Sequence, residues 1–461
     1  MSITGVGRLL RLDLRRDRWM LLWWVLGVVV LYWSQAVSTE GLYPTQAEFD
    51  KAARAMADNT AFIALAGPAR ALNTLGGQVA WQASAFGAVV AGLMSMFLVG
   101  RHTRVEEETG RDELVRATAV GRHAPTAAAA LVVLVANVLL GGLVAASLLG
   151  YGLAVAGSIS LGLAAAMAGL AFGAVALVAV QLAGSARGAY GITGAVIAGS
   201  YVLRAVGDVT GGGLSWLSPI GWGQSMHAFS GERWWPALLS VAAVAVLGVT
   251  AVRLLDRRDH GAGIRAARPG PATAGRDLGG VHGLAWRLQR GTVLGWAVGL
   301  LATGLSYGAI GNSTDDIVGD SQFAEDLFGG TGPGATDLFY ATLVGMLALL
   351  AAGFAIASAG RPASEEGNGR LDLLLAGPVT RARWALGHLT VTVVGTLAVL
   401  AAGGVGLAVG FGLSTGDWST GARLLRATLP YVAPVLVLAA VAWLGYAVRP
   451  SRASATPYRR A

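Results

Sequence analysis

The sequence predicts an all-α polytopic membrane protein, and three observations support this fold class. Apolar residues make up 54% of the 461 residues and charged residues only 13%, against about 25% charged residues in ordinary soluble domains. The mean hydropathy is +0.59. The apolar residues also cluster in blocks of about twenty without an acid or a lysine. At about 1.5 Å per residue, a helix of that length crosses a hydrocarbon core of about 30 Å.

Ten segments have the length and composition of helical membrane spans. The first, 19–37, is predicted to be a retained anchor and not a cleaved signal peptide, because eighteen residues precede it and it holds four tryptophans. The ten predicted spans cover residues 19–37, 79–100, 126–151, 159–182, 189–206, 236–255, 292–310, 339–359, 385–411 and 427–448.

The basic residues predict the orientation of these spans. With the N-terminus inside, 27 of the 34 lysines and arginines fall on the inner side and seven on the outer side, whereas the acids divide evenly. Cytoplasmic loops carry such an excess of basic residues. We therefore expect a multi-pass protein of the cell (plasma) membrane with both termini in the cytoplasm. The pI near 10.2 then reflects topology, and no nucleic-acid partner is expected.

The chain also repeats itself. The segment Glu106–Arg122 recurs 259 residues later as Glu365–Arg381, with eight of seventeen aligned positions identical. A second match, around the first and seventh spans, has an offset of 272. The two offsets differ by thirteen, which is also the difference in length between the predicted outer loops 38–78 and 311–338. Since both repeated loops fall inside, we expect two copies in the same orientation.

The repeat predicts the domain organisation. Residues 1–255 form a first transmembrane domain of six spans, and 256–283, rich in Gly, Ala, Pro and Arg, form a cytoplasmic linker. Residues 284–461 form a second transmembrane domain of four spans. This second domain is shortened at its C-terminus, because the polar and basic tail after Val448 cannot span a membrane.

The first copy opens with a basic amphipathic segment, which we expect to lie in the inner headgroup layer. Helical geometry places Val6, Leu9, Leu10 and Leu14 on one face and Arg8, Arg11, Arg15 and Arg18 on the other.

The candidate functional residues lie in the two repeated charged loops. Each loop offers acids, then glycine and arginine, and then a short apolar helix that leads into a long span. A merely solvated turn has no need of the same acids at the same spacing twice, so the repetition favours docking of a partner protein. Docking would bury Leu114 and Leu373. The docking residues are predicted to be Glu106, Glu107, Gly110, Arg111, Glu113, Leu114 and Arg122 in the first loop, and Glu365, Glu366, Gly369, Arg370, Asp372, Leu373 and Arg381 in the second.

The second loop resembles the charged loop and coupling helix of type-two ABC exporter permeases. In that family a leucine-rich segment precedes a Pro-Val-Ser/Thr-Arg element, which stands here as Pro378-Val379-Thr380-Arg381. The first loop departs from the pattern, with Arg116 in place of a leucine and Ala119 in place of the proline. The tandem fusion resembles the exporters of polyketide antibiotics.

The resemblance implies a multidrug or antibiotic efflux permease that exports hydrophobic or amphipathic compounds. It implies a separate ATPase chain, in two copies, whose binding to the charged loops drives transport and which carries the ATP. Because the second loop matches the family more fully, Glu366→Arg is expected to impair ATPase binding and drug resistance more than Glu107→Arg.

Two features belong to the predicted outer side. Ser218, Pro219, Gly221 and Trp222 fit an interfacial aromatic belt, and by resemblance they also fit a re-entrant helix with a Ser-Pro motif. Arg204 and Asp208 stand four residues apart at a helix end and are predicted to pair.

Several classes of function are excluded or disfavoured. The chain has no cysteine, its six histidines are scattered, and its one lysine, Lys51, is not in a phosphate loop. We therefore expect no enzyme activity, no metal and no cofactor in this chain. An ion-coupled transporter would need carboxylates inside the membrane, and the ten predicted spans contain none. A transport-inactive, shortened permease remains open as an alternative.

Overall fold

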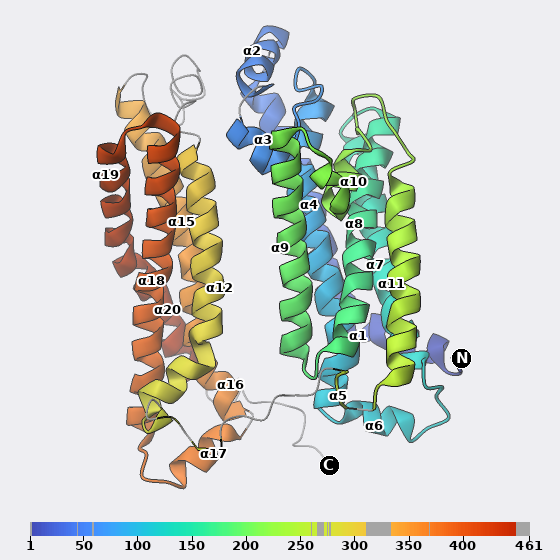
Figure 1. Cartoon of the computed structure of the whole chain (residues 1–461), viewed down its shortest axis with the longest axis vertical. Coiled ribbons are helices and arrows are strands. Elements are labelled where there is room, and N and C mark those ends of the chain that lie inside the picture. Colours follow the sequence, from blue (N-terminus) through green and yellow to red (C-terminus); the bar gives the residue numbers. More distant parts are fainter. Residues whose placement is uncertain are drawn as a thin grey trace. The chain divides into compact units, whose positions relative to one another are not determined.

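The computed structural model describes residues 2–43, 45–57, 60–259, 261–264, 272–273, 275, 278–309, 333–367 and 369–448, and the regular elements in these ranges are all helices (Figure 1). The chain divides into two compact units, Met1–Pro269 and Gly270–Ala461. Residues 265–271 of the predicted linker 256–283, residues 311–332 of the predicted outer loop 311–338, and the tail after Val448 lie outside the described residues.

Ten helical segments in the described ranges are long and apolar enough to cross a membrane. Each overlaps one predicted span, which confirms the ten predicted positions. All ten are longer than predicted, and the first and the last are examples. The first runs from Val6 to Leu42 and the last from Trp418 to Val448.

Unit 1 is a bundle around a central helix. Its central helix α8 (Val155–Leu182) packs against four other spans, α4, α7, α9 and α11. Small residues permit this close packing of helices. At Gly141 of α7 there is no room for a larger residue, because an added Cβ would lie 2.6 Å from the carbonyl oxygen of Gly162 in α8. The spans of unit 1 are α1 (Val6–Leu42), α4 (Leu75–Gly100), α7 (Ala124–Gly150), α8 (Val155–Leu182), α9 (Ala186–Thr210) and α11 (Ala237–Arg257).

Short helices cover the two ends of unit 1 (Figure 1). One end carries α2 (Gln46–Ala57), α3 (Thr60–Ala66), the 3₁₀ helix Gly213–Leu217 and α10 (Pro219–Gln224). The other end carries the π-helical extension of α4 (Arg101–Val105), α5 (Glu106–Glu108) and α6 (Arg111–Arg116).

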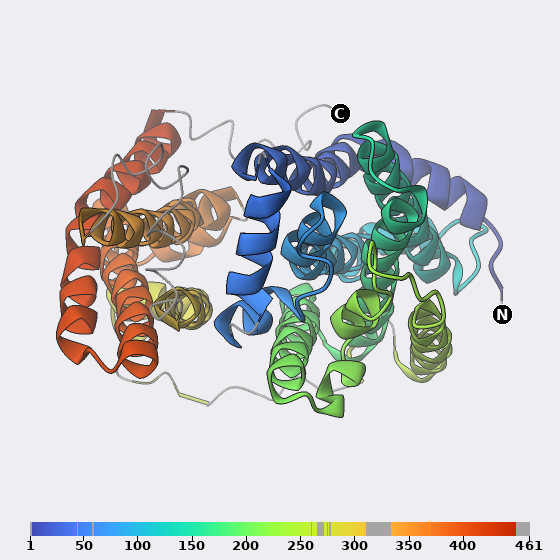
Figure 2. The ribbon, with the colours of Figure 1, turned by 90° about the horizontal axis from the view of Figure 1, so that it is seen from above.

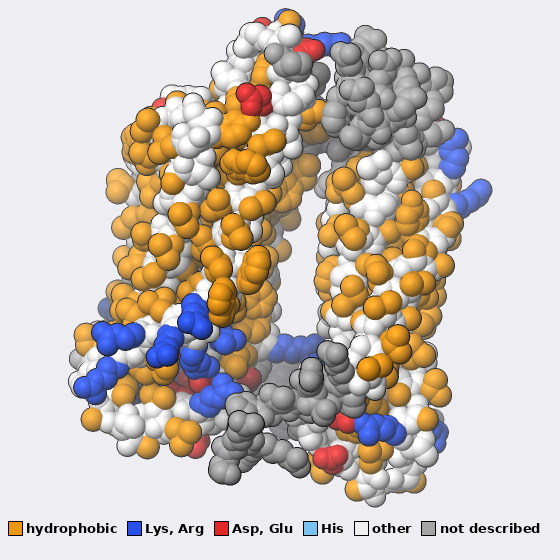
Figure 3. All heavy atoms as spheres, turned by 180° about the vertical axis from the view of Figure 1, so that it is seen from behind, with side chains coloured by type: hydrophobic (Ala, Val, Ile, Leu, Met, Phe, Trp, Pro, Cys, Tyr) orange, Lys and Arg blue, Asp and Glu red, His pale blue; other side chains and the backbone are white. Residues whose placement is uncertain are grey.

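The amphipathic opening is part of α1 itself. The predicted basic face, Arg8, Arg11, Arg15 and Arg18, is exposed, while Leu10 and Leu14 pack against the core of unit 1. A helix of 37 residues is about 55 Å long, so α1 extends beyond a hydrocarbon core of about 30 Å. Figure 3 shows Lys and Arg side chains gathered at the α1–α6 end of unit 1, with an apolar belt beside them.

Unit 2 is a smaller bundle, and Figure 2 looks along the helices of each unit. Its helices are α12 (Val281–Ala309), α15 (Pro333–Ala359), α16 (Arg361–Gly367), α17 (Arg370–Leu375), α18 (Arg381–Thr415), α19 (Trp418–Thr428), the 3₁₀ helix Leu429–Tyr431 and α20 (Val432–Val448).

Glycines bring α12 and α18 into backbone contact. A Cβ added at Gly304 would lie 2.1 Å from the carbonyl oxygen of Gly403, and one at Gly410 would lie 2.3 Å from that of Leu305. Spacing of the GxxxG kind permits such an approach. The same spacing at Gly295 and Gly299 has no such role, since nothing lies within 4 Å of a Cβ added at either residue.

Candidate functional site

The two charged loops fold in the same way. In each, a glycine in the left-handed region precedes a six-residue helix: Gly110 has φ 71° and begins α6, and Gly369 has φ 69° and begins α17. Glycine adopts this conformation without strain. The helix bounds Arg111–Arg116 and Arg370–Leu375 differ by the same 259 residues as the sequence repeat.

An ion pair closes each turn at equivalent positions. Arg111 Nη1 lies 3.5 Å from Glu106 Oε1, and Arg370 Nη1 lies 3.3 Å from Glu365 Oε1. Each acid binds a second arginine, since Arg16 reaches Glu106 at 2.9 Å and Arg361 reaches Glu365 at 2.8 Å. Because Arg111 and Arg370 are at least half exposed, these pairs shape the turns more than they stabilise the fold.

Each short helix carries one strongly exposed leucine at the equivalent position. Leu114 is 74% exposed and Leu373 is 80% exposed. Two residues earlier in each helix, Asp112 and Leu371 are buried, so the two helices lie on the bundle in the same register. The acids Glu113 and Asp372 precede these leucines and are exposed. Leu114 and Leu373 therefore form one equivalent exposed apolar position in each unit.

Glu107 is bound inside its own unit. Arg104 Nη1 lies 2.8 Å from Glu107 Oε2, and Arg258 donates to both carboxylate oxygens, one bond being 3.0 Å long. The three side chains are at most 6% exposed. Arg104 also donates to the carbonyl oxygens of Val180 at the end of α8 and Ala262 beyond α11. Glu107 thus ties the loop to other helices of unit 1, and its predicted docking to a partner stays a prediction.

Other residues anchor the first loop further. Glu108 accepts a 2.7 Å hydrogen bond from the backbone N–H of Ala186, the first residue of α9. Arg122 donates to the carbonyl oxygens of Leu255 and Asp256 at the end of α11, at 3.0 and 3.3 Å. The contacts of the first loop therefore reach α8, α9 and α11.

The second loop is held differently. Glu366 pairs with Arg381, at the start of α18, and accepts a hydrogen bond from the hydroxyl of Tyr446 in α20. Its side chain is 25% exposed. The equivalent residues Arg122 and Arg381 thus have different partners in the two units.

A buried cluster of charged residues lies beside the first loop and was missed by sequence analysis. His102 Nε2 lies 2.6 Å from Asp17 Oδ2, and its Nδ1 lies 3.3 Å from Asp13 Oδ1. Arg101 Nε lies 2.9 Å from Asp17 Oδ1. Both acids precede the predicted span 19–37 and belong to α1, so the extension of that helix places carboxylates inside the bundle. Their cationic partners compensate their charge.

On the opposite end of unit 1, the predicted Arg204–Asp208 pair is confirmed at 3.6 Å. Arg204 also donates to the carbonyl oxygens of Ile63 and Leu65, at 3.3 and 2.9 Å. Its guanidinium lies 4.5 Å from the ring centre of Tyr201. Arg204 therefore fastens α3 to α9.

The predicted Ser-Pro motif starts α10. Buried Ser218 caps the helix by accepting from the N–H groups of Ile220 and Gly221, and Pro219 is its first residue. Trp222 donates from Nε1 to the carbonyl oxygen of Trp216 at 2.6 Å. The helix has six residues and packs against α8 and α4. Whether this segment enters a membrane stays a prediction.

Comparison with known proteins gives two matches. The family described as the C-terminal domain of the multidrug efflux system permease Rv1217c matches residues 278–457. Over 420 residues the chain is 41% identical to the multidrug efflux system permease protein Rv1217c of Mycobacterium tuberculosis, which covers 90% of this chain and 76% of that protein.

Proposed function

This chain belongs to the family of multidrug efflux system permeases, and on that premise we propose that it is the membrane-spanning permease of an ATP-driven ABC exporter. A separate ATPase chain, in two copies, hydrolyses the ATP. The exported compounds are hydrophobic or amphipathic, such as antibiotics. The exporter lies in the cell membrane with both termini in the cytoplasm, as the distribution of basic residues indicates.

The need for a separate ATPase follows from the composition. The lysine of a phosphate loop reaches the β- and γ-phosphates of a bound nucleotide. The one lysine of this chain, Lys51, follows Phe49-Asp50 and not a glycine-rich loop. We therefore infer that another chain supplies the nucleotide site.

The proposed architecture is a tandem pair of domains, with six spans before the linker 256–283 and four after it. The two domains share the glycine turn, the ion pair that closes it and the length of the following helix. The two loops have the same local structure, and they are separated by the same number of residues as the sequence repeat. This agreement supports descent of both domains from one duplicated domain.

The observation that carries the docking proposal is the equivalent exposure of Leu114 and Leu373. Each stands on a short helix that leads into a long span, α7 or α18, and the topology prediction places both helices in the cytoplasm. Burial of a leucine side chain contributes about 1.5–3 kcal/mol. We propose that each leucine enters a cleft of an ATPase subunit, next to Glu113 or Asp372.

Co-purification with the ATPase tests this proposal. Leu114→Asp and Leu373→Asp, each made in the full chain, should weaken ATPase binding by about 10- to 150-fold, the affinity equivalent of one buried leucine. Both substitutions together should abolish co-purification and drug resistance.

Leu217→Asp is the matched control, because Leu217 is 65% exposed in a short helix at the opposite end of unit 1. It should retain the ATPase. Wild-type binding in the double variant, with normal membrane insertion, would show that the ATPase does not dock on these leucines.

A further inference from the structure

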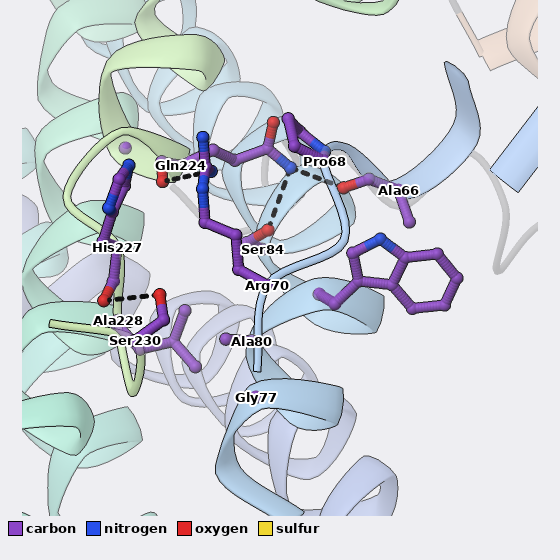
Figure 4. A pocket seen from close by; sticks show the side chains of 13 residues that line it. Ala66, Pro68, Arg70, Gly77, Ala80, Ser84, Gln224, His227, Ala228 and Ser230 are labelled. Atoms are coloured by element: carbon purple, nitrogen blue, oxygen red, sulfur yellow. Dashed lines mark hydrogen bonds between the residues drawn. The ribbon is translucent and has the colours of Figure 1, made fainter. Parts of the chain in front are cut away.

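A small pocket opens at the end of unit 1 opposite the charged loop (Figure 4). Its lining comes from the start of α4, the segment before α4, α10 and the loop after α10. The free volume is about 40 Å³, and one water needs about 10–15 Å³ by the same measure. The pocket therefore has room for a group of a few heavy atoms, and not for a whole drug molecule.

Arg70, which has no ion pair among the described residues, lines this pocket. Within the described residues, Arg70 makes one hydrogen bond, 3.4 Å to the carbonyl oxygen of Gln224, and no ion pair within 4 Å. The nearby acid Asp208 is engaged by Arg204 at 3.6 Å and by the hydroxyl of Ser215 at 2.7 Å. Burial lowers the pKa of the Arg70 guanidinium, which is the effect of removing a cation from water without a matching charge.

Neutral hydrogen-bonding groups surround Arg70. In Figure 4 its guanidinium is drawn between His227 and Gln224. The Gln224 amide is fixed by bonds to the carbonyl oxygen of Ala66 at 2.6 Å and to Ser84 at 3.1 Å. Burial, with Arg70 and Arg233 nearby, lowers the pKa of His227 to about 4, so its ring is uncharged at neutral pH. The pocket thus offers one cation among neutral polar groups.

The backbone around the pocket is strained. Among the described non-glycine residues, positive φ angles occur at Ala71, His227 and Phe229, with values of 47°, 54° and 60°. The Phe229 ring holds this loop in place, because a Cβ added at Gly76 or Gly157 would lie 2.5 or 2.1 Å from it. Strain of this kind persists where the surroundings fix it, and it gathers at ligand-binding sites.

The pocket lies at the aromatic end of the bundle. Trp216 and Trp235 stack there with ring centres 5.2 Å apart, and Trp222 belongs to the same segment. Tryptophan is enriched at the boundary between lipid and water. A group bound in the pocket would therefore sit at the depth of lipid headgroups.

We propose that this pocket binds a single oxyanion, a carboxylate or a phosphate, carried by an amphiphile in the adjoining membrane leaflet. The Arg70 guanidinium donates charge-assisted hydrogen bonds to the oxyanion, and His227 adds a neutral donor. Such bonds are the stronger kind in proteins. The amphiphile is either a phospholipid or a free anionic compound, and its apolar chain stays in the membrane. This binding does not depend on the ATPase, so it can be tested separately from the docking proposal.

Titration of the purified full chain in a neutral detergent tests the site. The probes are decanoate and dihexanoyl phosphatidate, each compared with an uncharged or zwitterionic counterpart, decanol and dihexanoyl phosphatidylcholine. The two anionic probes distinguish a free amphiphile from a lipid phosphate, and binding of either one supports the site. Arg70→Gln should lower the affinity by about 10-fold or more, the usual effect of removing a hydrogen bond to a charged group.

Arg233→Gln is the matched control, because it removes an exposed positive charge near the same pocket and should leave the affinity within about 3-fold, as expected for a screened surface charge. A second variant, Ala80→Leu, fills the pocket and leaves Arg70 in place, and it should also abolish binding. Equal losses in Arg70→Gln and Arg233→Gln, equal binding of the neutral probes, or no binding of either anion to the wild type would overturn the proposal.

Discussion

At the scale of single residues, burial separates two roles within the charged loops. Glu107 is 6% exposed and is bound by two arginines of its own unit, whereas Leu114, seven positions later, is 74% exposed. A buried, paired carboxylate fixes the loop, and an exposed leucine is available to another protein. Sequence analysis predicted both as docking residues, and it could not show the burial of Glu107, because spacing carries no information on contacts with distant segments.

The buried Asp17 should be important for folding. Asp17→Asn leaves Arg101 without its carboxylate and His102 with Asp13 alone, and breaking a buried pair costs about 3–5 kcal/mol. We expect about 3 kcal/mol, the lower end, because Arg101 is 42% exposed. Denaturant unfolding in detergent measures this loss. Exposed Asp259→Asn should unfold like the wild type, and an equal loss in both variants would contradict the role of the cluster.

Charge reversal should affect the two loops unequally. The resemblance to the exporter family ranks Glu366→Arg as the more damaging, but the structure predicts the reverse for stability. Glu107→Arg would place a third arginine beside Arg104 and Arg258 at a buried site, whereas Glu366 is 25% exposed. We expect a loss of at least about 3 kcal/mol for Glu107→Arg and a clearly smaller one for Glu366→Arg. Equal melting temperatures of the two variants would contradict this ranking.

At the scale of elements, the helices were predictable and their ends were not. Apolar blocks located all ten spans, and the repeat located the two short helices after Gly110 and Gly369. The extension of α1 to Val6 was missed because its arginines are characteristic of a surface helix, while its buried Asp13 and Asp17 depend on His102, 85 residues away from Asp17. The strained loop around His227 has no periodic pattern that would reveal it.

The packing of α12 against α18 gives a prediction at this scale. A Cβ added at Gly308 would lie 2.2 Å from the carbonyl oxygen of Leu407, so Gly308→Val must push the helices apart, at a cost of about 1–3 kcal/mol or more. The melting temperature of the purified variant measures the effect. Gly299→Val on the same helix has open space within 4 Å and should change stability little. If Gly299→Val were as damaging as Gly308→Val, helix propensity and not close packing would explain the loss.

At the scale of the whole molecule, membership of a multidrug efflux permease family and the two equivalent loops lead to one account. The spans form the membrane part, and the short helices that follow α4 and α15 are the proposed docking sites of the ATPase. In unit 1 the first loop is joined to α8, α9 and α11 through Arg104, Glu108 and Arg122. The second loop connects to α18 and α20 through Glu366. The sequence predicted the two loops, whereas these connections join residues far apart in the chain and needed the structure.

Cross-linking tests the central claim, that the ATPase docks on α6 and α17, most directly. The chain has no cysteine, so Leu114→Cys, Leu373→Cys and the control Leu217→Cys can each carry a single benzophenone-maleimide label. After illumination of membranes that contain the ATPase, the account predicts a cross-linked permease–ATPase product for labels at positions 114 and 373 and none at position 217. Absence of the product at both 114 and 373, with the ATPase still co-purifying, would contradict it.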